Sequence, residues 1–308
     1  MGRRGLFLFG GTVLTLMLQI GAGALGSVGA LLNFLIPLPA AYAHMRAGSV
    51  IGGIIVVAST GVLAGIGEVE AAVGYVLQFG FASFLLPFFL RRSWSWDRVV
   101  AMTTLCVLGL GGLALGGYTL SQGTPVRQLV QNYVQKEVTQ ALNIYQQSNV
   151  TPEQKEDLDR FGQHLTDYLV SAYPALALTV TWIMLLFTVY LLSVLSAGNY
   201  AISGPPFYLW HVHPLLVWGL IGGGFGLVFF DGPLEVIALN LLTVVLPIYF
   251  LNGLAIVSYF FRKKNISPAF RALGFLLIVV LNPLPLIVTG FGVFDLWADF
   301  RKPKIKET

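Results

Sequence analysis

Long apolar runs, separated by short polar connections, make up most of this chain. They cover roughly 5–25, 28–44, 48–66, 69–90, 98–120, 167–196, 208–230, 235–261 and 267–299. A helix needs about 20 residues to cross a hydrocarbon core about 30 Å thick, and most of these runs reach that length. The pattern therefore predicts an all-α protein, a polytopic membrane helix bundle of about 8–10 membrane segments.

The last apolar run is interrupted by two prolines. Asn282, Pro283 and Pro285 lie in its middle. Proline lacks a backbone donor and disfavours helix in the residue before it. The piece 267–281 would be about 22 Å long as a helix, too short to span a bilayer. We therefore predict a helix break at these three residues, with a re-entrant or broken hairpin as the resulting structure.

The longest polar stretch, 121–167, also carries a helical pattern. Apolar residues recur in it every three or four positions, with polar residues between them. Thr151 suits a helix N-cap, and Pro152 suits the first helical position. This pattern predicts a two-helix extracytoplasmic insertion that lies on the bilayer or covers the bundle. The insertion either packs only or closes over a site.

The distribution of charge predicts an orientation. Most of the 18 Lys and Arg residues flank alternate apolar runs and the C-terminus, whereas the other connections are mainly acidic. Basic flanks stay in the cytoplasm, so we predict a bacterial inner-membrane protein with both termini cytoplasmic. The predicted regions are N-terminal membrane helices (1–120), extracytoplasmic helices (121–167), C-terminal membrane helices (168–300) and a basic cytoplasmic tail (301–308).

Composition agrees with this class of protein. The 308 residues are 56% apolar and 10% charged, which excludes an ordinary soluble domain. The isoelectric point near 9.2 reflects the basic flanks of membrane helices. The bilayer is thus the expected partner, with other membrane or cytoplasmic subunits as further candidates, and no nucleic acid.

The ionisable residues favour no catalytic or metal chemistry. Asp, Glu, Lys and Arg all fall near the ends of the apolar runs, which argues against an autonomous ion-coupled pump. His211 and His213 would point about 200° apart on a helix, and acids for further ligands are expected across the membrane. No nucleotide-binding or hydrolase motif occurs. We predict no enzyme activity, no metal and no cofactor.

Amides are the main polar groups inside the apolar runs. Gln78, Asn240 and Asn252 could hydrogen-bond a neutral or zwitterionic ligand, with Tyr133 and Tyr168 of the outer helices facing it. These five residues are the predicted ligand-binding candidates. The alternative role for the amides is to hold helices together.

Three stretches of the second half carry a resemblance to a known family. They are PPFYLWHVHPLLVW (205–218), NLLTVVLPIYFLNGLAI (240–256) and GVFDLWADFRK (292–302). Together they resemble the YybS-like family of predicted bacterial multi-pass membrane proteins, which has no established activity and so implies no site residues. In architecture the chain resembles the substrate-binding subunits of energy-coupling-factor vitamin transporters.

Two functions follow as hypotheses. The first is a substrate-binding or transport subunit for a small molecule that depends on partners for energy. The second is a structural or assembly scaffold for envelope machinery. A closed polar pocket around Gln78, Asn240 or Asn252 favours transport, and a solid core favours the scaffold.

Overall fold

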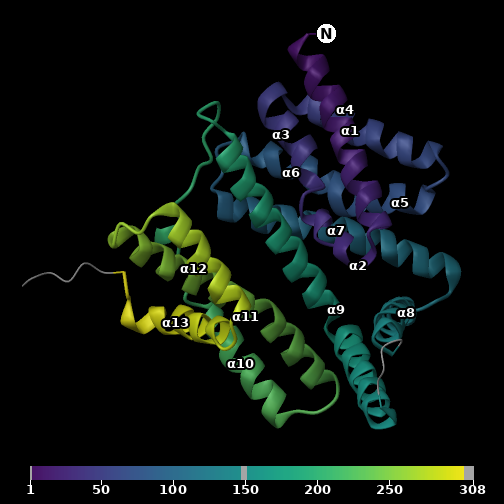
Figure 1. The fold of residues 1–308 in the computed structure, drawn as a ribbon, viewed down its shortest axis with the longest axis vertical. Coiled ribbons are helices and arrows are strands. Elements are labelled where there is room, and N and C mark those ends of the chain that lie inside the picture. Colours follow the sequence, from purple (N-terminus) through teal and green to yellow (C-terminus); the bar gives the residue numbers. More distant parts are fainter. Residues whose placement is uncertain (1, 147–150, 302–308) are drawn as a thin grey trace, which may run out of the picture. The chain divides into compact units, whose positions relative to one another are not determined.

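The computed structural model describes residues 2–146 and 151–301, and this part of the chain is helical without strands (Figure 1). The predicted all-α fold is therefore confirmed. The chain forms two compact units, Met1–Val126 with Val180–Gly204, and Arg127–Thr179 with Pro205–Thr308. We call them unit 1 and unit 2.

Unit 1 contains the N-terminal helices and the end of the longest helix. Its elements are α1 (Arg3–Ala24), α2 (Gly26–Gly29), η1 (Leu32–Phe34), α3 (Pro37–Ala47), α4 (Ser49–Gly65), α5 (Val69–Gly74), the π-helix η2 (Tyr75–Gly80), α6 (Phe81–Leu90), α7 (Trp96–Gln122) and the C-terminal part of α9 (Pro152–Leu195). Its core gathers fully buried side chains such as Tyr75, Leu86, Val99 and Leu185. Segments far apart in the chain thus share one apolar interior.

Unit 2 contains the remaining helices. Its elements are α8 (Val126–Gln146), the first part of α9, η3 (Phe207–Leu209), α10 (Leu216–Phe229), α11 (Pro233–Lys263), α12 (Pro268–Val280) and α13 (Leu284–Ala298). Glycines let α10 and α13 approach α11 closely. A Cβ at Gly226 would lie 2.6 Å from the Cβ of Ala238, and a Cβ at Gly292 would overlap the backbone oxygen of Tyr249. Such small residues let helix backbones pack directly against each other.

The helices have the lengths that a membrane requires. Five of the described helical segments are long and apolar enough to cross a bilayer, or six if α12 and α13 count as one span. α4 and α10 are shorter apolar helices of the same kind. Most of each predicted apolar run is helical, although 28–44 is divided into α2, η1 and α3, the last of which begins at Pro37. The run 208–230 also begins with η3 and a non-helical segment before α10 starts at Leu216. The membrane-protein class is thus supported by geometry as well as by hydropathy.

The predicted break in the last run is present. α12 ends at Val280, α13 begins at Leu284, and the two axes meet at 102°. The backbone N–H of Leu281 still bonds to Leu277, whereas Pro283 and Pro285 have no N–H to extend the ladder. The prolines therefore divide one apolar run into two helices, and Asn282 is exposed at the corner.

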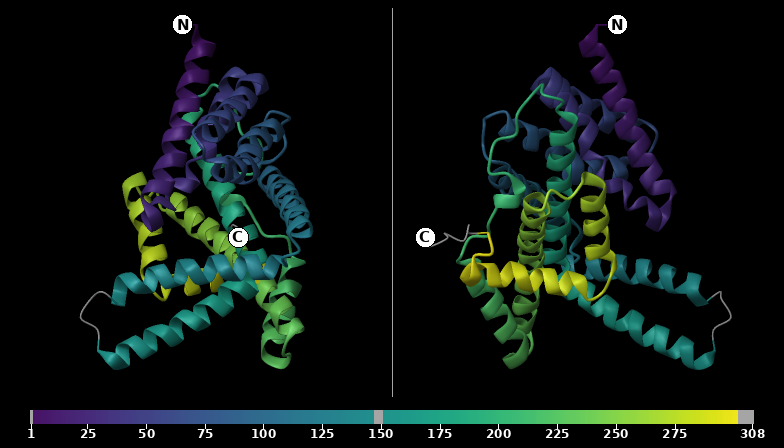
Figure 2. Two further views of the ribbon diagram at one scale, coloured as in Figure 1. Left: turned by 90° about the vertical axis from the view of Figure 1, so that its right-hand side faces the viewer. Right: turned by 60° about the vertical axis from the view of Figure 1, so that its left-hand side comes forward.

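The two helices predicted within 121–167 are α8 and the start of α9, which lie side by side in Figure 2. α9 begins with a capping box, in which Thr151 N–H donates to Gln154 Oε1 at 2.9 Å and Gln154 N–H donates to Thr151 Oγ1 at 3.3 Å. At 44 residues, α9 exceeds what a bilayer of about 30 Å requires. That residues 121–167 lie on the extracytoplasmic side of the membrane stays a prediction.

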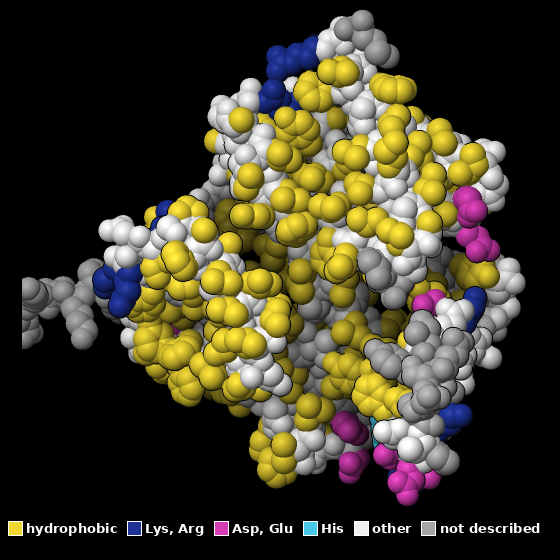
Figure 3. All heavy atoms as spheres, in the orientation of Figure 1, with side chains coloured by type: hydrophobic (Ala, Val, Ile, Leu, Met, Phe, Trp, Pro, Cys, Tyr) yellow, Lys and Arg dark blue, Asp and Glu magenta, His cyan; other side chains and the backbone are white. Residues whose placement is uncertain are grey.

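The surface of the described chain is unusually apolar. Side chains such as Leu113 (76%) and Leu120 (87%) are largely exposed, and apolar side chains cover much of the face drawn in Figure 3. A water-soluble monomer rarely exposes so much contiguous apolar surface. Lipid contact accounts for it.

Candidate functional site

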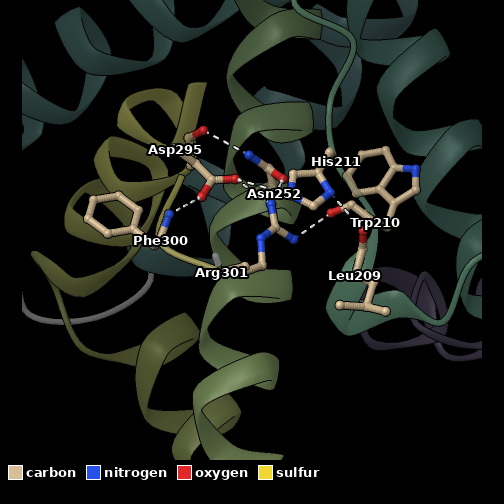
Figure 4. Close-up of polar contacts among 8 residues, drawn as sticks. Leu209, Trp210, His211, Asn252, Asp295, Phe300 and Arg301 are labelled. Carbon is tan, nitrogen blue, oxygen red and sulfur yellow. Dashed lines mark hydrogen bonds and ion pairs between the residues drawn. The ribbon is translucent and has the colours of Figure 1, made fainter. Parts of the chain in front are cut away.

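A buried ion pair lies inside unit 2, near the end of α13 (Figure 4). Asp295 and Arg301 are each 5% exposed, and Arg301 Nη2 donates to Asp295 Oδ2. The turn after α13 makes this pairing possible. Asp299 adopts a left-handed conformation with φ 41°, so the chain reverses and returns Arg301 to the helix. Phe300 N–H also donates to Asp295 Oδ1 at 3.1 Å.

Arg301 joins three parts of the chain through its other hydrogen bonds. Its Nη2 donates to Asn252 Oδ1 of α11 at 3.0 Å, and its Nη1 donates to the backbone oxygen of Trp210 at 2.6 Å. Asn252 Nδ2 then donates to the backbone oxygen of Gly292 at 2.8 Å. A planar guanidinium with several fixed donors suits such a multi-partner role. The cluster therefore connects the end of α13 and the segment around Trp210 to α11.

His211 lies at the exposed side of the same cluster. Its Nδ1 lies 2.7 Å from the backbone oxygen of Leu209, so Nδ1 carries the proton and donates. Its Nε2 lies 4.0 Å from Asp295 Oδ2. The segment around it is extended rather than helical, with Trp210 at φ −71° and ψ 136°. His213 points to its own backbone and accepts from Leu215 N–H at 3.3 Å.

These positions bear on two sequence-based predictions. Arg301, the first residue of the predicted tail, is buried, because the turn at Asp299 returns it to Asp295. The prediction that acids lie across the membrane from His211 is wrong, because the fold brings Asp295 beside it. The described residues still contain no group of three or more acidic, histidine or cysteine side chains suited to a metal ion.

The other predicted amide in unit 2, Asn240, bonds the backbone of α9. Its Oδ1 accepts from Ala175 N–H at 3.2 Å, and its Nδ2 donates to the backbone oxygen of Ser171 at 2.8 Å. Pro174 lies between these two residues and removes a donor from the helix. Asn240 therefore supplies hydrogen bonds at a proline position and ties α11 to α9.

The remaining predicted ligand residues are on exposed faces. Gln78 is exposed on the π-helix η2 of unit 1, Tyr133 on α8 is 66% exposed, and Tyr168 on α9 is 42% exposed. Their role in ligand binding stays a prediction. Asn252 and Asn240, by contrast, are engaged by neighbouring helices.

Sequence reasoning missed Asp295 and Arg301 as a pair. One signal was available: Asp295 lies within an apolar stretch, and an arginine follows six residues later. A second signal was the set of three stretches that carry the family resemblance. Trp210, Asn252 and Arg301 come one from each stretch, and they meet in this cluster.

The fold and this interior define a multi-pass α-helical membrane protein. The chain belongs to the family described as "Predicted membrane protein (DUF2232)", whose match covers residues 13–296. The match therefore includes most of both units and reaches Asp295, and it ends before Arg301. Comparison with curated proteins finds no match, and neither does comparison with solved structures.

Proposed function

We propose that this membrane protein is a substrate-binding subunit for a small polar molecule, and that unit 1 holds the molecule. The supporting observation is the π-helix η2, which interrupts the membrane helix formed by residues 69–90. π-Helical turns are rare, and they occur frequently at functional sites because they change the direction of side chains within a helix.

The interior beside η2 holds polar groups that need partners. Tyr75 begins the π-helix and is fully buried, as are Ser59 of α4 and Thr103 of α7. The Tyr75 hydroxyl lies near Ser59. None of the three hydroxyls forms a hydrogen bond of normal geometry within the described chain. An unsatisfied buried polar group costs about 1–3 kcal/mol. A polar ligand or ordered water in this interior would recover that energy.

The proposal predicts what copurifies with the protein. Tyr75→Phe and Ser59→Ala each remove one buried oxygen without changing the apolar packing much. We expect each substitution to lower the amount of a copurified polar small molecule by about tenfold, equivalent to about 1.4 kcal/mol of lost binding. Mass spectrometry of extracts from equal amounts of purified protein measures this loss.

Thr60→Ala is the matched control for this experiment. Thr60 neighbours Ser59 on α4, but its hydroxyl already donates to the backbone oxygen of Val56 at 2.8 Å. The control should retain the molecule at the level of the unchanged protein. Extracts without any retained small molecule would contradict the proposal.

The scaffold is the second candidate function, and the asparagines of unit 2 favour it. Asn240 and Asn252 join α11 to α9 and α13 rather than facing a pocket. In that case α8 and the exposed face of α9 would bind an envelope protein. Crosslinking in membranes tests this alternative. Two results together would favour the scaffold over substrate binding: capture of one protein partner in stoichiometric amount, and no small molecule in extracts of the purified protein.

We also propose the orientation that the charges indicate, a bacterial inner-membrane protein with both termini in the cytoplasm. A fluorescent reporter fused to the C-terminus should fold and fluoresce, because it would be cytoplasmic. A periplasmic phosphatase fused at residue 145 should be active, because α8 would be outside. Finding both fusion sites on one side of the membrane would exclude this orientation.

A further inference from the structure

Unit 2 has a second polar feature at the turn between α11 and α12. It is a hollow of about 570 Å³ lined by Tyr208, Tyr259, Arg262, Lys263, Asn265 and Arg271. We call it the basic hollow. Figure 3 shows Lys and Arg side chains gathered at this end of unit 2, beside apolar side chains. Three of the six lining residues are cations, and none is acidic.

Aromatic rings and a carbonyl hold the three cations in place. The guanidinium carbon of Arg262 lies 4.5 Å from the centre of the Tyr208 ring, and Lys263 Nζ lies 5.7 Å from the centre of the Tyr259 ring. Arg271 Nε donates to the backbone oxygen of Ile266 at 2.7 Å. Across residues 2–146 and 151–301, none of the three cations forms an ion pair with a carboxylate. Their charge is therefore not balanced locally.

Basic residues that only orient a membrane helix need no such arrangement. Positive flanks act through their number and side of the membrane, and Arg262 and Lys263 also suit the last turn of α11. Here the fold brings residues from η3, from the end of α11 and from α12 to one concave surface. Arginine donors at such a surface match the oxygens of a phosphate group.

We propose that the basic hollow binds a phosphate group, the chemistry that an anionic phospholipid headgroup and inorganic phosphate share. The surroundings favour the lipid as its source. α12 continues from Arg271 with exposed apolar side chains, among them Leu273 (47%) and Leu277 (41%). These exposed apolar side chains indicate that lipid surrounds the helix that borders the hollow, so acyl chains would be close to a headgroup bound there. Basic pockets between membrane helices bind anionic lipids in this way.

Native mass spectrometry of the full chain in detergent tests the proposal, with phosphatidylglycerol and phosphatidylcholine as probes. We expect the protein to retain phosphatidylglycerol more tightly. Arg262→Gln and Lys263→Gln should each weaken this retention about fivefold, since each removes one cation near the headgroup. Both side chains are exposed, so the fold should tolerate their loss. Arg271→Gln should act likewise.

Arg92→Gln is the control, because Arg92 is also exposed and also lies over a ring, 4.0 Å from the centre of Phe88 in unit 1. It should leave retention within about twofold. Inorganic phosphate distinguishes the source: displacement of the lipid by millimolar phosphate would identify free phosphate as the natural occupant. Equal retention of the two lipids would overturn the proposal, as would equal losses in Arg92→Gln and Arg262→Gln.

Discussion

Replacing Arg301 with methionine is expected to lower the free energy of unfolding by about 3–5 kcal/mol. The substitution would leave the Asp295 carboxylate buried with no opposite charge, and would remove the bonds to Asn252 and Trp210. Uncompensated buried charges are among the most costly single changes in a folded protein. Denaturant or thermal unfolding of the purified protein in detergent measures the loss.

Two further variants sharpen this prediction. Arg98→Met removes an exposed arginine and should cost less than about 1 kcal/mol. The double variant Asp295→Leu, Arg301→Met removes both charges, so it should recover most of the stability that Arg301→Met loses. If Arg301→Met unfolds at the same denaturant concentration as the unchanged protein, the pair does not hold unit 2 together.

The second large effect is expected at the crossing of α11 and α13. A Cβ at Gly253 would overlap the backbone oxygen of Val288, and a Cβ at Gly292 would overlap that of Tyr249. Backbone atoms cannot move aside as flexible side chains do. Gly253→Ala and Gly292→Ala should therefore each separate the helices and cost about 1–3 kcal/mol or more.

Gly290→Ala is the matched control at this crossing. Gly290 lies two residues from Gly292 on α13, but a Cβ there would have no heavy atom within 4 Å. Alanine is a better helix former than glycine, so this change should be neutral or stabilise by up to about 1 kcal/mol. Equal unfolding midpoints for Gly290→Ala and Gly292→Ala would show that the crossing is not close.

The two predictions concern one structural feature. The glycine crossing brings the backbone of Gly292 against α11, where Asn252 Nδ2 bonds its oxygen. Arg301 then closes over Asn252 and Asp295. Separation of the helices should therefore also weaken the ion pair, and the effects of Gly292→Ala and Arg301→Met should not be additive.

Features that depend on a few neighbouring residues could be predicted from the sequence. Thr151 and Pro152 indicated the start of α9, and the structure has the capping box there. Pro283 and Pro285 indicated the end of one helix and the start of another. Each effect arises from backbone donors and dihedral angles within about one helical turn, so no distant contact was needed.

The candidate site could be predicted only in part. Asn252 was chosen as a polar residue within an apolar run, and it is indeed a member of the cluster. Its partners were not found, because Asp295 and Arg301 lie near the end of an apolar run, where charges normally meet water. The π-helix that begins at Tyr75 was also not predicted, because the apolar pattern there fits an ordinary α-helix.

The sequence by itself determined the class of this protein: a chain of apolar helices, their ends, and the break at Asn282–Pro285. Local hydropathy and backbone chemistry are sufficient for those features. Only the tertiary structure decided that Arg301 is buried, that Asn240 completes the backbone at Pro174, and that Gly253 and Gly292 meet. The physical reason is that burial and pairing depend on which helices pack together. That packing joins residues about 50 positions apart, and composition or periodicity along a single helix does not specify it.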